Sequence, residues 1–184
     1  VFNGELVQGA TVSAMELGMI YLPGTHIGSA QHGAVLLEDL TSRLSLAAQG
    51  GVACYRGQAE ALNKKTAGNL RDLKSKALAG SLRAGDEGTM VMFSNSVRYL
   101  GLGVAIVVNL MAPDRIVLGG GLVEELPSVY VNLLKEEVAK YALPSLAKPI
   151  RYVVAKLGGN AVAVGAVAWL RHMTEKTKRE VVKA

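Results

Sequence analysis

The amino-acid sequence predicts one α/β domain with a mixed sheet flanked by helices. Half of the 184 residues are apolar, so the chain can bury a sizeable core. After residue 85 the pattern of apolar residues alternates between helix, strand, helix, strand and helix, which is typical of parallel strands covered by helices. An Asn-Gly pair near the start predicts a hairpin, which adds antiparallel strands to the sheet.

The hairpin is expected at Asn3-Gly4, because both residues tolerate the positive φ of a type I′ turn. Val1 is not an initiator methionine, so we expect the chain to be a piece of a longer protein, with the first strand of this hairpin mostly absent. Residues 9–36 are punctuated by glycines and predict a long irregular stretch. Such stretches are usually functional or disordered.

Helices are predicted where apolar residues recur at spacings of three and four. The predicted segments are, in order, a helix over 36–49, a polar surface insertion over 55–72, short helical turns over 73–78 and 80–83, and a long helix over 86–111. The second half of the long helix is apolar nearly all round, so we expect it to be buried. Pro113 ends it.

A strand, a helix and a second strand complete the predicted sheet. The first strand is expected over 115–118, the helix over 126–141 with Pro144 as its stop, and the β-branched second strand over 150–157. Asn160 then precedes the last helix, where an N-cap role is favoured over a place beside a ligand.

Composition excludes several classes of protein. The net charge of +5 is partly concentrated in residues 176–183, which favours a solvated helix end over a nucleic-acid site, since no aromatic residues interleave with the basic ones. Cys54 is the only cysteine, which excludes an intramolecular disulfide and suits a reducing compartment. No apolar run reaches the length of a membrane span, and the first residues lack the regions of a signal peptide. We therefore expect a cytoplasmic protein without membrane or nucleic-acid partners.

Three glycines, Gly119, Gly120 and Gly121, follow the predicted strand 115–118. Ligands of open α/β sheets bind at the carboxyl ends of strands, and residues without a Cβ let a flat ring or a phosphate approach the backbone. A tight turn from strand to helix explains the same glycines equally well, so both interpretations stay open on spacing alone. The run is not a P-loop, because no Gly-Lys-Ser/Thr follows it.

Two carboxylates, Glu16 and Glu38, lie in or beside the glycine-punctuated stretch. A carboxylate binds sugar hydroxyls well because it accepts several hydrogen bonds, although each of these taken alone is better explained as a surface charge. His26 and His32 make a weak case for a metal site, since no zinc-ligand pattern surrounds them. His172 is expected to be solvated, and no serine has the paired histidine and acid of a nucleophile.

Residues 99–122 resemble proteins of the ROK family (repressor, open reading frame, kinase). They share a buried helix that ends in Asn-x-x-x-Pro, here Asn109 to Pro113, and a strand that ends in three glycines. Gly158-Gly-Asn160-Ala161 is similar to the family's closing Gly-Asp-Asn-Ala. The resemblance implies the C-terminal domain of an actin-like ATPase (ribonuclease H-like) fold, in which Gly119–Gly121 pack on the adenosine of ATP.

The sugar loop of the family is matched in part. Glu16 falls on the Glu of Gly-x-Ala-Gly-Glu-x-Gly-His, and Glu38 falls on the Glu that closes a later cysteine-rich pattern, which implies that both bind sugar. Val12 and Met15 replace glycines of this loop. The family's zinc-ligating histidine and three cysteines are replaced by Met19, Ser29, Gln31 and Leu36. These side chains cannot form a tetrahedral zinc site, so no zinc is predicted, and a polar contact to the sugar is lost at Met19.

The resemblance implies that residues 1–184 form the C-terminal domain of an ATP-dependent hexose kinase, similar to glucokinases, that uses Mg²⁺. The family's phosphate loops and general base would lie before Val1, so no catalytic residue is assigned here and the chain is not expected to transfer phosphate alone. A homodimer is expected, because similar proteins commonly dimerise through this domain. The alternatives are a sugar-responsive transcriptional regulator of the same family, or a degenerate non-catalytic member.

Overall fold

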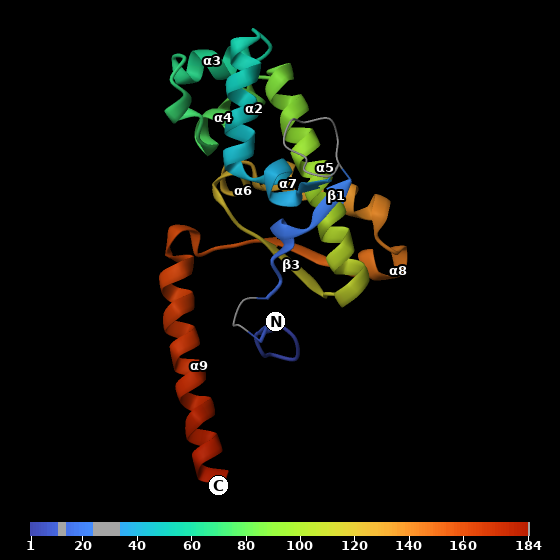
Figure 1. The fold of residues 1–184 in the computed structure, drawn as a ribbon, viewed down its shortest axis with the longest axis vertical. Coiled ribbons are helices and arrows are strands. Elements are labelled where there is room, and N and C mark those ends of the chain that lie inside the picture. Colours follow the sequence, from blue (N-terminus) through green and yellow to red (C-terminus); the bar gives the residue numbers. More distant parts are fainter. Residues whose placement is uncertain (11–13, 24–33, 184) are drawn as a thin grey trace.

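The computed structural model describes residues 1–10, 14–23 and 34–183 (Figure 1). Its elements, in chain order, are η1 Leu17–Met19, β1 Tyr21–Pro23, β2 Ala34–Leu36, α1 Leu37–Thr41, α2 Arg43–Tyr55, α3 Glu60–Thr66, η3 Leu70–Asp72, α4 Ser75–Arg83, α5 Glu87–Met111, β3 Arg115–Leu118, α6 Gly121–Glu125, α7 Pro127–Tyr141, α8 Pro144–Ala147, β4 Arg151–Val154, η4 Gly158–Asn160 and α9 Ala161–Lys183. The α/β class is confirmed, and β3 has the predicted bounds.

The strands β3 and β4 pair in parallel, with Arg115 opposite Arg151 and Leu118 opposite Val154. Helices α6 to α8 form the crossover between them, as the alternating pattern predicted. The antiparallel strands β1 and β2 pair with each other, with Tyr21 opposite Leu36. Among the described residues these are two separate two-stranded sheets rather than the single mixed sheet that was expected.

The predicted turn at Asn3-Gly4 is present. Asn3 has φ 50° and Gly4 has φ 81°, and the backbones of Phe2 and Glu5 pair across the turn. Beyond Glu5, residues 6–10 form no extended strand, and Gly9 alone is an isolated bridge residue.

The long helix α5 is the centre of the fold and packs against α7, α1 and α2. Its glycines permit this packing: a Cβ on Gly101 would lie 2.4 Å from Cβ of Glu137 on α7, and a Cβ on Gly103 would lie 2.4 Å from a methyl carbon of Leu37 on α1. Among the described helices, α5 alone is long and apolar enough to cross a membrane. Half of that apolar stretch is buried inside this fold, so α5 is its core helix.

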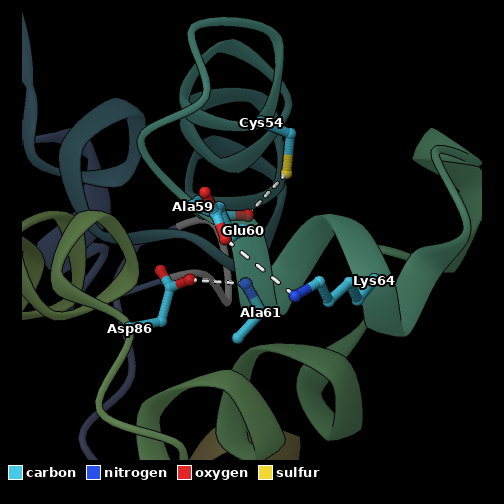
Figure 2. Close-up of polar contacts among 6 residues, drawn as sticks. All are labelled: Cys54, Ala59, Glu60, Ala61, Lys64 and Asp86. Carbon is cyan, nitrogen blue, oxygen red and sulfur yellow. Dashed lines mark hydrogen bonds and ion pairs between the residues drawn. The ribbon is translucent and has the colours of Figure 1, made fainter.

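The expected surface insertion over 55–72 is wrong in its central part. Ala59 and Leu62 are fully buried in the main core, because α3 packs against α4. The carboxylate of Asp86, at the start of α5, accepts a hydrogen bond from the backbone N–H of Ala61 at 2.8 Å, which Figure 2 shows. Most residues of this segment are polar, but the few apolar ones point inward from a short helix. A polar composition therefore did not show that part of the segment is buried.

Candidate nucleotide and sugar sites

The three glycines after β3 form the turn that leads into α6, and they differ in what they require. Gly120 has φ 110°, which favours glycine whatever the space around it. A Cβ on Gly121 would lie 2.7 Å from Oγ of Ser75, so this position needs a glycine for close packing. A Cβ on Gly119 would meet only Cβ of Ala155 at 3.5 Å, an ordinary contact. The geometry of the turn therefore requires glycine at positions 120 and 121, whereas neither packing nor a positive φ requires it at position 119.

A hollow of about 730 Å³ lies beside this turn. Gly121 and Ser75 line it, so it opens where β3 ends and where α4 begins. Four basic side chains surround it: Arg43, Lys65, Lys74 and Lys76. Three acidic residues also line it: Asp72, Glu124 and Glu125. The basic residues exceed the acidic ones by one, so the hollow has a small net positive charge.

The basic residues of this hollow were missed by the sequence analysis. Lys65, Lys74 and Lys76 come from the segment that was expected to be a surface insertion and from the helical turns after it. Their spacing along the chain gives no sign that they meet, because α3 and α4 must first pack together. The only signal was that Lys74 and Lys76 flank Ser75, close to the start of the predicted helical turns.

The structure holds α4 firmly against the glycine turn. The Arg83 guanidinium donates to the backbone carbonyl of Glu125 at 2.5 Å and lies 3.6 Å from the carboxylate of the same residue. These contacts join the end of α4 to the end of α6. A second contact between α4 and α6 therefore lies at the end of α4 opposite to Ser75.

The two predicted sugar-binding carboxylates lie on neighbouring elements. Glu16 precedes η1 and Glu38 is in the first turn of α1, and both are exposed. The backbone N–H of Leu37 donates to the carbonyl of Ile20 at 2.9 Å, which holds α1 beside η1. A Cβ on Gly18 would lie 3.2 Å from both Cβ and Oε2 of Glu38, so the glycine of the loop packs against this carboxylate.

Met15 shows that the backbone of the loop has the shape that a glycine would favour. It has φ 65°, a conformation that is uncommon for residues other than glycine, at a position where the resemblance places a glycine. Met19 is half-exposed on η1. Met15 therefore has a left-handed backbone although it carries a side chain.

The zinc prediction falls mostly on residues outside the described structure. His26, Ser29, Gln31 and His32 lie in the segment 24–33, as Val12 lies in 11–13. Among the described residues, no group of three or more His, Cys, Asp or Glu side chains is arranged to hold a metal ion. The absence of zinc stays a prediction.

The two candidate sites are joined through consecutive helices. Glu38 lies in α1, and Arg43, the first residue of α2, lines the hollow beside the glycine turn. The side chain of Ser42 between them accepts a hydrogen bond from the backbone N–H of Ser45 at 3.1 Å and caps α2. One short segment thus contributes to both sites.

Comparisons with known proteins agree with this geometry. The ROK family model matches residues 1–173. A glucokinase from Halalkalibacterium halodurans is 28% identical over 182 residues, which cover 96% of this chain and 53% of the glucokinase. A xylose repressor from Bacillus spizizenii is 32% identical over 80 residues, which cover 44% of this chain and 21% of the repressor.

A solved structure supports the predicted fold. The crystal structure of a ROK family glucokinase from Streptomyces griseus in complex with glucose and AMPPNP superposes with a TM-score of 0.70 and 24% identity. The superposition covers 88% of this chain and 53% of that chain. The actin-like ATPase fold is thereby confirmed, and the chain spans about half the length of the glucokinases that it matches.

Proposed function

Since this chain belongs to the ROK family, we propose that it forms the nucleotide-facing, C-terminal part of an ATP-dependent hexose kinase similar to glucokinases. One observation carries the proposal: a hollow lined by four basic and three acidic side chains lies beside the glycine turn after β3. Its basic side chains can contact the phosphates of a nucleotide. A glycine turn lets a flat adenosine ring approach the backbone.

In this proposal Gly119, Gly120 and Gly121 line the adenosine. Packing leaves room for a Cβ at Gly119 and at Gly120, but only at Gly119 is the glycine required neither by close packing nor by a positive φ. Lys74 and Lys76 flank Ser75 at the start of α4 and attract the negative charge of the nucleotide.

Glu16 and Glu38 bind the sugar in this proposal, because carboxylate oxygens accept hydrogen bonds from hydroxyl groups. Mg²⁺ accompanies ATP through the phosphate oxygens, since the described residues gather no cluster of acidic ligands for it. The chain positions both substrates, and phosphoryl transfer depends mainly on positioning and charge stabilisation. No general base is assigned among residues 1–184.

The test is the substitution Gly119→Val, which adds a side chain where packing allows one. We expect ATP affinity, measured by calorimetry, to fall at least about tenfold, or about 1.4 kcal/mol. Gly120→Val would be a poor choice, because the φ of 110° would strain the backbone and confuse loss of binding with loss of fold.

The matched control is Gly165→Val on α9, where a Cβ would meet nothing within 4 Å. This control should bind ATP as the parent chain does. If Gly119→Val binds ATP as tightly as the parent chain does, the three glycines form a structural turn and do not line the nucleotide. Kinase activity itself is tested with the complete gene product on a panel of hexoses, and phosphorylation of none of them would reject the kinase.

The second candidate function is a sugar-responsive transcriptional regulator, and the likeness to the xylose repressor supports it. The replacement of the zinc ligands at Met19 and Leu36 weakens it, because regulators that resemble this chain usually keep that site. A regulator would bind a sugar and shift a DNA fragment in a gel without consuming ATP. A kinase would consume ATP in a sugar-dependent manner.

A further inference from the structure

The carboxylate of Glu124 lies between the segments that follow the two parallel strands. Glu124 is in α6, one helical turn after Gly121 of the glycine turn that follows β3. A Cβ on Gly158, in η4 after β4, would lie 3.8 Å from Oε1 of Glu124. The two segments adjoin, because the backbone N–H of Ala155 donates to the carbonyl of Leu118 at 2.7 Å. Ligands of α/β sheets bind at the carboxyl ends of strands, so this carboxylate lies where a ligand of the parallel pair would bind.

Glu124 differs from the two other acidic residues that line the hollow beside the glycine turn. Asp72 accepts a hydrogen bond from the side-chain amide of Asn69 at 2.8 Å, and the carboxylate of Glu125 lies 3.6 Å from the guanidinium of Arg83. Within the described ranges, the side chain of Glu124 forms neither a hydrogen bond nor an ion pair, and it is exposed. Its two carboxylate oxygens are therefore free to accept hydrogen bonds from a ligand.

The negative charge of Glu124 limits which part of a nucleotide can lie beside it. Like charges at contact distance repel each other, so the phosphates should lie toward Lys74 and Lys76 and away from Glu124. The uncharged parts of the nucleotide, which are the base and the ribose, remain as partners for this carboxylate.

The ribose matches a carboxylate better than the base does. The 2′ and 3′ hydroxyls of a ribose present two neighbouring donors, and an ionised carboxylate presents two acceptor oxygens. Dinucleotide-binding folds use the same contact between an acidic side chain and a ribose hydroxyl. An adenine edge instead presents a donor next to an acceptor, a pattern that the amide of Asn or Gln matches and a carboxylate does not.

We infer that Glu124 binds the 2′ and 3′ hydroxyls of the nucleotide ribose and makes the site selective for ribonucleotides over deoxyribonucleotides. This inference rests on the proposed function, because it assigns one part of ATP within the proposed nucleotide site. The glycine turn then lines the base, Glu124 binds the ribose, and Lys74 and Lys76 attract the phosphates. This order along the site is the order of the three parts in the nucleotide itself.

The test compares the affinities of ATP and 2′-deoxy-ATP, measured by calorimetry with the complete gene product. The parent should bind ATP at least about tenfold more tightly, which is the effect of one hydrogen bond to a charged group. Glu124→Gln keeps the size of the side chain but removes one acceptor and the charge, and it should reduce this preference to within about threefold. Both ligands carry the same phosphates, so their ratio cancels any general effect of the lost charge on triphosphate binding.

The matched control is Glu136→Gln, at an exposed glutamate on α7 that does not line the hollow. This variant should keep the preference of the parent. Inosine triphosphate controls for the base, because it has the same ribose but a carbonyl in place of the 6-amino group of adenine. Glu124→Gln should leave the ratio between the affinities of ATP and inosine triphosphate within about threefold of the parent.

Two results would overturn the ribose contact and leave the proposed function intact. One is a parent that binds ATP and 2′-deoxy-ATP equally well, or a Glu124→Gln variant that keeps the full preference for ATP. The other is a Glu124→Gln variant that changes the ratio for inosine triphosphate instead, which would assign the carboxylate to the base. A parent that binds no ATP would overturn both the ribose contact and the proposed function, so the two failures are distinguished.

Discussion

Ala112 ends α5 in a left-handed conformation, with φ 44° and ψ 56°. This conformation costs an L-residue with a Cβ roughly 1–2 kcal/mol, and glycine is preferred there at helix ends. We therefore expect Ala112→Gly to raise the free energy of unfolding by about 0.5–1 kcal/mol, measured by urea denaturation.

A matched control is available at the end of α4. Ala84 is also a C-cap alanine, but it has φ −81° in the right-handed region. Ala84→Gly should therefore give no gain and a small loss, since glycine adds flexibility to the unfolded chain. Equal effects of the two substitutions would show that the conformation of Ala112 stores no strain.

Single residues also show where sequence reasoning was sound. Asn109 is one of the residues that carry the resemblance, and in the structure its side chain forms two hydrogen bonds to the backbone. Its side chain accepts from the backbone N–H of Leu143 at 2.9 Å and donates to the carbonyl of Tyr141 at 3.2 Å. Asn109 thus fixes the end of α5 to the turn between α7 and α8, which sets the position of β3 that follows.

Among the elements, the start of α5 depends on one buried carboxylate. Asp86 accepts hydrogen bonds from the backbone N–H of Thr89 at 2.9 Å, from its hydroxyl at 2.7 Å, and from the N–H of Ala61. Burial by itself would raise the pKa of Asp86, but these hydrogen bonds from Thr89, Ala61 and Leu62 outweigh it and lower the pKa below its usual value.

The lowered pKa gives the fold a predictable acid sensitivity. A carboxyl group with a lower pKa in the folded state stabilises the fold above the unfolded pKa, near 3.9. This stability is lost as the pH falls below about 4 toward the folded pKa. Asp86→Ala should lower the free energy of unfolding at pH 7 by about 2–4 kcal/mol, because it removes a cap and leaves N–H groups buried without a partner.

The measurement is urea denaturation of the parent and Asp86→Ala between pH 3 and pH 7. The difference between them should shrink as the pH falls, since the parent loses the same interaction. Asp114→Asn, an exposed position, serves as the control and should leave the pH dependence unchanged. A difference that stays constant with pH would contradict the role of the ionised carboxylate.

At the element scale, local signals predicted what depends on a few neighbouring residues. The strand β3 and the long helix α5 follow from the spacing of apolar residues and from Pro113. The burial of α3 could not be predicted, because Ala59 and Leu62 find their partners only when α3 and α4 meet in space. The basic hollow is a product of the same packing, so no role could be predicted from the sequence for Lys65, Lys74 and Lys76.

For the whole molecule, α9 stands apart from the rest of the chain (Figure 1). Described residues of α9 are absent from both core clusters, and His172 contacts Glu5 of the N-terminal hairpin at an exposed position. Surface ion pairs of this kind contribute about 0–1 kcal/mol. Ending the chain after Asn160 should therefore change the free energy of unfolding of the remaining body by less than about 1 kcal/mol.

Urea denaturation of the parent and of the chain that ends after Asn160 measures this difference. Val162 and Leu170 on α9 are 84% and 68% exposed, so ending the chain there removes apolar surface that the fold leaves in water rather than apolar surface that it buries. The two chains should therefore unfold at nearly the same urea concentration. A loss of more than about 2 kcal/mol in the shortened chain would show that α9 packs on the body of the fold and stabilises it.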